Sequence, residues 1–291
     1  MQKAENGDSS AMYKVGETYY MGYFGLYDIE KARYWFNKAV EAGNIDGYIG
    51  LGRLEYFTYD YKRDIDKATE YFNLAAENGS LLAKKWLARI NLYYKDREVG
   101  LKQLQELAEM DCPSANIDLA YYFLFDKPDI EKAEVYVKRS VELKEISSTY
   151  LLASLYDAKK EYDKYLEEIA KSIEEGDGYA DTDVAIKYYN GTLFEKDYIK
   201  AFNWFQRAAT VYNNNSLFYL GVCYQFGFGC IKDDKKALEF YELSAKRGSL
   251  SGLRQPDIFI FLEKVVRWMK QKHSSYINLL LIGGLKMLIV T

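Results

Sequence analysis

Side chains that could perform acid–base or metal chemistry are scarce in this chain of 291 residues. His273 is the only histidine, so the chain can assemble neither a histidine-based catalytic triad nor a site with several histidine ligands. None of the three cysteines, Cys112, Cys223 and Cys230, belongs to a C-x-x-C pair of the kind that binds structural zinc. The sequence therefore predicts no catalytic residue, no metal site, no cofactor and no enzymatic activity.

The one pair of thiols close in sequence is Cys223 and Cys230, which are seven positions apart. They span the predicted end of a helix and the turn that follows it, so a disulfide bridge is one interpretation. Free thiols are the favoured interpretation, and the sequence leaves the choice open.

The elements that must position any functional residue are short helices that repeat along the chain. From Ala11 to Gly43 the sequence predicts two helices joined by a glycine-bearing turn. In the second helix Ala32, Phe36 and Ala39 share one face, and Gly43 stands where a helix ends in a left-handed conformation. Copies of this second-helix pattern begin at positions 31, 67, 100, 132, 164, 200 and 236.

The first helix of each repeat carries a very small residue at one fixed position. We expect two helices to cross closely there, because neither brings a large side chain to the contact. This register agrees with that of the second helices and also has seven copies: Gly16, Gly52, Ala88, Ala120, Ala153, Ala185 and Gly221. Repeats of 32 to 36 residues indicate a stacked helical array rather than separate globular domains.

These residues resemble the Sel1-like repeat family, a relative of the tetratricopeptide repeat. The match includes Val15-Gly16 with Lys31-Ala32, and it is closest from Leu220-Gly221 to Lys236-Ala237. The middle repeats depart from the family pattern, because they lack the glycine-containing loop between their helices. The resemblance implies an all-α, right-handed α–α superhelical solenoid of seven Sel1-like, tetratricopeptide-like repeats with a C-terminal helical cap.

The repeat pattern divides the chain into three predicted segments. Residues 1–8 read as the remnant of a preceding repeat, residues 9–249 as the solenoid and residues 250–291 as a non-repeat helical segment. Within the last segment, the apolar stretch from Tyr276 to Thr291 has three interpretations. A cap on the last repeat is favoured, and a membrane or partner contact and a frame error or vector-derived tail are the alternatives.

Composition favours protein binding over nucleic-acid binding. The net charge is −4 and basic residues are scattered among acidic ones, which disfavours a nucleic-acid partner. The chain holds 29 tyrosines, and tyrosine is enriched at protein interfaces. Some of these residues are expected to pack between repeats instead. The predicted partner-binding residues, on a concave face lined by the first helices, are Tyr13, Glu17, Tyr20, Tyr48, Glu55, Tyr121, Tyr122 and Tyr189.

These observations predict a scaffold or adaptor that binds a peptide or a protein on its concave face. By resemblance, a bacterial regulator or immunity-type protein that masks a partner is one alternative, and a β-lactam-binding or β-lactam-hydrolysing relative is another. The chain as given predicts a soluble, cytoplasmic protein, and a periplasmic or secreted location stays open if the N-terminus is trimmed. The sequence does not indicate an oligomeric state.

Overall fold

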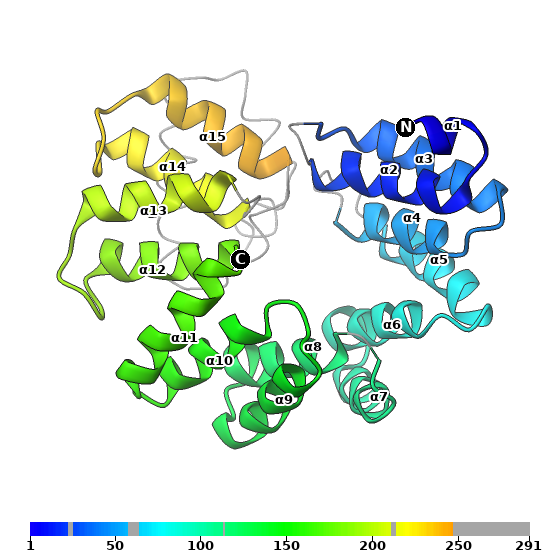
Figure 1. The fold of residues 1–291 in the computed structure, drawn as a ribbon, viewed down its shortest axis with the longest axis horizontal. Helices are drawn as coiled ribbons and strands as arrows, with labels where there is room; N and C mark the ends of the chain where they lie inside the picture. Colours follow the sequence, from blue (N-terminus) through cyan, green and yellow to red (C-terminus); the bar gives the residue numbers. More distant parts are fainter. Residues whose placement is uncertain (23–25, 58–63, 113, 211–213, 247–291) are drawn as a thin grey trace. The chain divides into compact units, whose positions relative to one another are not determined.

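The computed structural model describes residues 1–22, 26–57, 64–112, 114–210 and 214–246. All regular elements in these ranges are helices (Figure 1). The predicted C-terminal segment 250–291 lies outside the described residues, and so does the proposed cap within it. None of the helices described is long and apolar enough to cross a bilayer.

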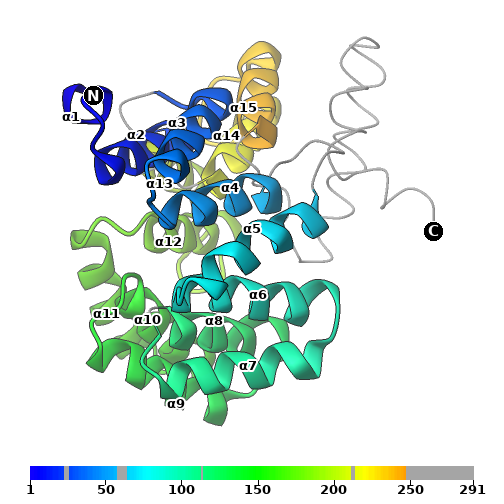
Figure 2. The same cartoon turned by 90° about the vertical axis from the view of Figure 1, so that its right-hand side faces the viewer.

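After the short helix α1 (Gln2–Glu5), the described residues form seven successive pairs, each made of a first and a second helix. Figures 1 and 2 show paired helices side by side, as for α6 with α7 and α14 with α15. The pairs are α2 (Ser9–Met21) and α3 (Ile29–Glu41), α4 (Asp46–Phe57) and α5 (Ile65–Glu77), α6 (Leu81–Tyr94) and α7 (Arg97–Glu109), α8 (Ala115–Tyr121) with the π-helix η2 (Tyr122–Asp126) and α9 (Ile130–Glu142), α10 (Ser148–Ala158) and α11 (Tyr162–Glu174), α12 (Gly178–Asn190) and α13 (Tyr198–Thr210), and α14 (Asn214–Phe226) and α15 (Asp234–Lys246). The predicted all-α solenoid of seven repeats is confirmed.

The chain divides into two compact units. Unit 1 consists of Met1–Tyr56 and Asp64–Asp177, and it holds α1 to α11. Unit 2 holds α12 to α15, within the described residues 178–210 and 214–246. The limits of the three segments predicted from sequence remain predictions.

An aspartate fixes the start of most second helices. At the start of α3, an Oδ1 atom of Asp28 accepts a hydrogen bond of 2.9 Å from the backbone N–H of Lys31. This bond satisfies one of the amide donors that a helix N-terminus leaves free. The Lys31 side chain then returns to the same carboxylate, with Nζ 3.2 Å from Oδ2. Equivalent aspartate caps are Asp64, Asp96, Asp129, Asp197 and Asp233.

The second helices of unit 1 end in a left-handed residue even where the sequence has no glycine. Gly43 and Gly79 take φ values of 82° and 87° at the ends of α3 and α5. In the middle repeats Asp111 and Lys144 occupy the same place with φ values of 51° and 52°. The junction is therefore kept where the family's glycine is missing, at the cost of a strained backbone.

The small residues of the first helices make room for aromatic rings of the second helices. A Cβ atom built on Gly16 would lie 2.6 Å from two ring carbons of Phe36, and one built on Gly50 would lie 2.5 Å from the same ring. Gly52 stands in the same relation to Phe72. The expectation that neither helix brings a large side chain to the contact is wrong. The second helix brings an aromatic ring, and the glycine of the first helix leaves room for it.

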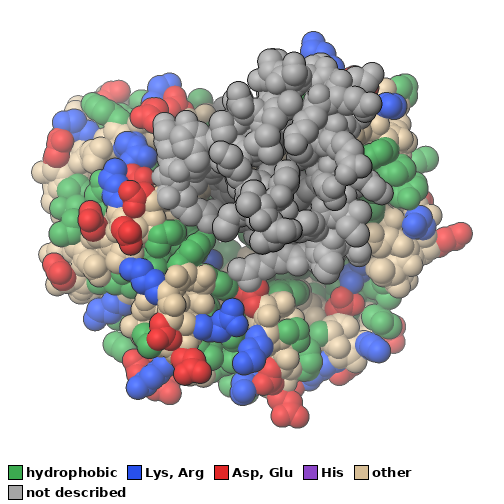
Figure 3. Space-filling model, turned by 180° about the vertical axis from the view of Figure 1, so that it is seen from behind, with side chains coloured by type: hydrophobic (Ala, Val, Ile, Leu, Met, Phe, Trp, Pro, Cys, Tyr) green, Lys and Arg blue, Asp and Glu red, His purple; other side chains and the backbone are tan. Residues whose placement is uncertain are grey.

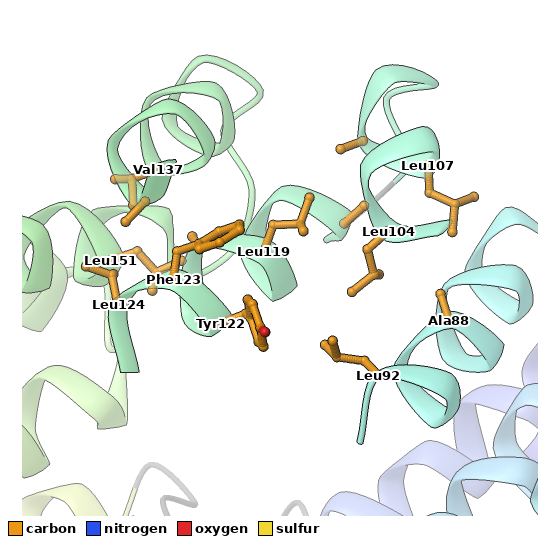
Figure 4. Close-up of a cluster of buried hydrophobic side chains, with 14 of the residues drawn as sticks. Ala88, Leu92, Leu104, Leu107, Leu119, Tyr122, Phe123, Leu124, Val137 and Leu151 are labelled. Atoms are coloured by element: carbon orange, nitrogen blue, oxygen red, sulfur yellow. The ribbon is translucent and has the colours of Figure 1, made fainter. Parts of the chain in front are cut away.

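The core of the middle repeats is a continuous apolar cluster that joins α6 to α10 (Figure 4). Leu104, Leu119 and Leu151 are fully enclosed within it. The cluster passes from one repeat to the next without a break, so each helix pair is stabilised by its neighbours. This support fixes the positions of α6 and α8 relative to one another within unit 1. Helix α4 contacts α6 through Tyr56, whose ring lies 5.4 Å from that of Trp86.

Candidate partner-binding face

Side chains at equivalent positions of successive first helices form one face of unit 1. Glu17, Arg53 and Arg89 each follow the small residue of their repeat, and they are spaced by 36 residues. Because this spacing equals the repeat length, the three side chains emerge at the same place on α2, α4 and α6. We call this surface the first-helix face, and its members are Tyr13, Glu17, Tyr20, Arg53, Lys85, Arg89, Tyr93 and Tyr121.

The first ion pair of this face joins α2 to α4. Nη1 of Arg53 donates to both carboxylate oxygens of Glu17, at 2.9 Å each. The guanidinium carbon of Arg53 lies 4.6 Å from the centre of the Tyr20 ring, a cation–π distance. Burial raises the pKa of both Tyr13 and Tyr20 to about 12, and Arg53 donates a hydrogen bond to each phenol oxygen.

A second charged group joins α6 to α8. Nη1 of Arg89 donates to Oδ1 of Asp118, and Nζ of Lys85 lies 3.7 Å from Oδ2 of the same carboxylate. Arg89 and Lys85 both lie 5.0 Å from the centre of the Trp86 ring. Lys85 and Asp118 are only 5% and 6% exposed, so this charge lies beneath the surface.

The C-terminal ends of α6 and η2 are joined by a further hydrogen bond. The hydroxyl of Tyr93 donates to Oδ2 of Asp126 at 2.7 Å. Burial raises the pKa of Tyr93, and the bond to Asp126 adds to this effect. One turn away, the ring of Tyr121 lies 5.4 Å from that of Phe125, which is half-exposed. The π-helix therefore presents an aromatic edge next to the charged part of the face.

Four of the eight predicted residues lie on the first-helix face. Tyr13, Glu17 and Tyr20 surround Arg53, and Tyr121 lies on α8. Tyr48 instead stacks on Tyr71 of α5, with ring centroids 6.4 Å apart. Tyr48 therefore contributes to the packing of α4 on α5.

Glu55 and Tyr122, two of the predicted partner-binding residues, are buried. Glu55 is 6% exposed, and its Oε1 lies 2.7 Å from Nη1 of Arg33 and 3.2 Å from Nζ of Lys67. It therefore bridges the second helices α3 and α5. Tyr122 is 3% exposed and lies within the apolar cluster between Leu119 and Leu92 (Figure 4).

The last predicted residue, Tyr189, belongs to unit 2 and lies among aromatic rings. Its ring is 5.4 Å from that of Tyr198, 5.9 Å from that of Tyr219 and 5.8 Å from that of Phe228. Burial raises the pKa of its phenol. Partner binding by any of the eight residues remains a prediction.

The sequence prediction missed the cations of this face. Arg53 and Arg89 share the position of Glu17, and the 36-residue spacing could have found them. No comparable signal indicated Lys85, which stands at the position that Ile49, Ile117 and Phe218 occupy in other repeats, and none indicated that Asp118 is buried. Elsewhere, acidic and basic side chains are interspersed over the described surface in Figure 3.

The cysteines supply no disulfide in this structure. Cys112, Cys223 and Cys230 are all free thiols, and the first two are buried. Burial raises the pKa of the Cys223 thiol to about 12. Among the described residues, no three His, Cys, Asp or Glu side chains gather in a way that could hold a metal ion.

The stacked helix pairs and their regular small-residue contacts define an α-helical repeat protein. The sequence pattern of the Sel1 repeat matches residues 9–44, 46–80, 113–144, 178–210 and 215–249, which together make up more than half of the chain. The chain belongs to the Sel1 repeat family. Sel1 repeat proteins are in general protein-interaction scaffolds, and their fold is typically non-catalytic.

Several solved structures share the fold. Immunity proteins Pa5087 and PA5088 from Pseudomonas aeruginosa are each 17% identical to this chain, with TM-scores of 0.53 and 0.52. The alignments cover 71% and 74% of this chain and 84% and 86% of those proteins. A Sel1 repeat protein from Oxalobacter formigenes is 20% identical over 90% of this chain and 77% of that one, with a TM-score of 0.45. No curated protein sequence matches the chain.

Proposed function

We propose that this protein is a scaffold that binds a peptide or a protein partner on the first-helix face. The observation that carries the proposal is the column formed by Glu17, Arg53 and Arg89 at one repeated position. Arginine, tyrosine and tryptophan are the residues that dominate binding energy at protein interfaces. This face brings the first two together on helices that pack against the core.

The ion pairs support binding because they order the arginines before a partner arrives. An arginine on a free surface loses side-chain freedom on binding, at a cost of about 0.5–1.5 kcal/mol. Arg53 and Arg89 are already fixed by Glu17, by Asp118 and by aromatic rings. Because the two arginine side chains are already ordered, a partner can bind them without a further loss of side-chain entropy.

A site-resolved cross-linking experiment tests the proposal. A photo-reactive phenylalanine analogue replaces Tyr121 on the first-helix face, and in a matched variant it replaces the exposed Tyr162 on α11. The full chain is irradiated in cells of the source organism, and adducts are identified by mass spectrometry. We expect one partner to be cross-linked from position 121 and not from 162. Equal adducts from both positions, or none from 121, would contradict the proposal.

A second candidate function is an immunity-type protein that masks a toxic partner. The supporting observation is the shared fold with the two Pseudomonas aeruginosa immunity proteins. Proteins encoded by neighbouring genes are expressed alone and with this chain in a sensitive host. Growth inhibition by one of them that co-expression relieves, together with a purified complex of the two, would support this candidate. A lack of any neutralised neighbour would exclude it and leave the general scaffold.

A further inference from the structure

Side chains at one repeated position tie first helices of unit 1 to the repeat that follows them. The position comes directly after the left-handed residue that ends a second helix, and Asn44, Cys112 and Glu145 occupy it. Each side chain bonds to backbone at the start of the preceding first helix, 31 to 35 residues earlier. Nδ2 of Asn44 donates to the carbonyl oxygen of Ser9 at 3.2 Å, and Sγ of Cys112 donates to that of Leu81 at 3.4 Å.

The tie made by Glu145 has the opposite direction. Its Oε1 accepts a hydrogen bond of 2.8 Å from the backbone N–H of Ser114, the residue that directly precedes α8. Ser114 is left-handed, with φ 64°, and its own side chain makes no cap on α8. The Glu145 carboxyl therefore holds the backbone at the point where α8 begins.

This carboxyl group is enclosed but poorly compensated. Its second oxygen, Oε2, is buried and has no hydrogen-bond partner among the described residues. The structure also gives Glu145 no ion pair within the described part of the chain. An ionised carboxylate in such a place lacks the contacts that normally offset the loss of hydration.

The charged groups around Glu145 oppose its ionisation on balance. Burial raises the pKa of Glu145, and the carboxylates of Asp118 and Asp111 add to this, whereas the Ser114 N–H and Lys85 lower it. Because the folded-state pKa lies above the ordinary value of 4.5, ionisation favours the unfolded chain. The fold therefore loses stability as the pH rises from 4.5 through the folded-state pKa.

The other titratable groups at this junction supply no counter-charge. Arg139 of α9 donates to Asp111 at 2.8 Å and to Glu142 at 3.1 Å. Burial raises the pKa of the Cys112 thiol, and Glu145 adds to this effect, so the thiol stays neutral at neutral pH. Lys85 lies 3.7 Å from Asp118, with which it shares its charge.

We propose that Glu145 makes the junction between the fourth and fifth helix pairs sensitive to pH: the neutral side chain holds the start of α8, and the ionised side chain loosens it. A neutral carboxyl still offers a carbonyl oxygen to the Ser114 N–H and buries no charge. An ionised one gains hydration when the turn opens. Because α8 carries Asp118 and Tyr121, this junction controls the order of part of the first-helix face.

The test compares Glu145→Gln with the wild-type full chain, because glutamine keeps the accepting oxygen and removes the charge. At pH 7 the urea midpoint, followed by circular dichroism, should rise by about 0.5 M. The rise should disappear below pH 4.5, where the wild-type carboxyl is neutral as well. Hydrogen exchange at pH 7, measured by mass spectrometry, should be slower in the variant for peptides covering residues 114–121.

Two further variants separate the charge from the hydrogen bond. Glu142→Gln is the matched control, because Glu142 is exposed and pairs with Arg139 at the surface. It should leave the midpoint and the exchange of α8 unchanged. Glu145→Leu removes the acceptor together with the charge, so α8 should exchange faster than in Glu145→Gln at both pH values.

Three results would overturn the inference. The first is a Glu145→Gln variant that fails to fold at pH 7 or has a midpoint no higher than that of the wild type. The second is a rise that persists undiminished at pH 4. The third is a higher midpoint with unchanged exchange in α8, which would place the effect away from this junction.

Discussion

The ring of Phe36 on α3 lies so close to Gly16 on α2 that any β-carbon at residue 16 would overlap it. Such a carbon would lie 2.6 Å from two ring atoms, whereas ordinary van der Waals contact begins near 3.4 Å. The same relation joins Gly221 to Tyr241 in unit 2, at 2.6 Å. Each of these rings therefore occupies the space that its glycine leaves open, and this contact sets the distance between the two helices of the repeat.

Gly16→Ala should lower the stability of the protein. Alanine is a better helix former than glycine by about 1 kcal/mol, but the clash with Phe36 outweighs this gain. Overpacking of a filled core costs about 1–3 kcal/mol. We therefore expect a lower urea midpoint, measured by circular dichroism, and the midpoint is compared because repeat arrays need not unfold in two states.

Two further variants calibrate this result. Asn37→Ala changes an exposed position of α3 and should leave the midpoint unchanged or raise it slightly. Gly100→Ala should be worse than Gly16→Ala, because its β-carbon would meet the backbone nitrogen of Leu92, which moves less easily than a ring. A Gly16→Ala midpoint above that of the wild type would refute the packing argument.

Removal of the aspartate cap of α3 should destabilise the protein at neutral pH. Asp28→Ala loses the bond to the backbone of Lys31 and should cost about 1 kcal/mol in the free energy of unfolding. Asp28→Asn keeps a capping oxygen and should cost less. Chemical denaturation of the three proteins at pH 7 checks this order.

The same cap predicts a dependence on pH. The backbone N–H of Lys31, and then its side chain, lower the pKa of Asp28 below its ordinary value of 3.8. Because the folded-state pKa is the lower one, the carboxylate stabilises the fold above pH 3.8, and this contribution is lost as the pH falls below that value. The stability difference between wild type and Asp28→Ala should therefore shrink on acidification. A stability difference that grows as the pH falls would show that folding raises the pKa of Asp28 instead of lowering it.

Asp118→Asn should be among the more destabilising single changes in unit 1. It leaves the buried ammonium of Lys85 without its carboxylate, and breaking such a pair costs about 3 kcal/mol. Lys85→Met, by contrast, removes a buried charge and leaves the Arg89–Asp118 pair intact, so we expect little loss. The free energies of unfolding of both variants check these values.

The double variant Lys85→Met with Asp118→Asn completes a thermodynamic cycle. It should be more stable than Asp118→Asn alone, with a coupling energy of about 1–2 kcal/mol. Strict additivity would mean that Lys85 and Asp118 do not interact.

The three thiols should differ in reactivity. The thiolate is the reactive form, and burial raises the pKa of Cys223 to about 12. Cys230 also has a raised pKa, but it is the one thiol of the three that is partly exposed. Alkylation by iodoacetamide at pH 8, followed by peptide mapping, should modify Cys230 first. In urea all three should react alike, and rapid reaction of Cys223 in the native protein would contradict the burial described for α14.

The repeated spacing in the sequence was sufficient to predict the fold. Periodic positions such as Ala32, Phe36 and Ala39 define a helix face, and their recurrence indicates stacking, because each repeat contacts only its neighbours. The aspartate three residues before each Lys-Ala pair could also have predicted the caps, since capping depends on a few adjacent residues. Helix faces, repeats and helix caps can therefore be predicted from the sequence, because each depends on residues that are close together or regularly spaced.

The candidate site could not be predicted in full from the sequence, because residue spacing does not show which charged side chains are buried or paired. Glu55 and Arg53 are two residues apart on α4, yet Glu55 binds second helices while Arg53 pairs with Glu17 on α2. Lys85 and Asp118 come together from two first helices, although they are 33 positions apart. Spacing alone fixes which positions are equivalent between repeats. Which charges are buried, and which carboxylate each cation shares, follows only from the packing of neighbouring helices, because burial and pairing are properties of the assembled interface.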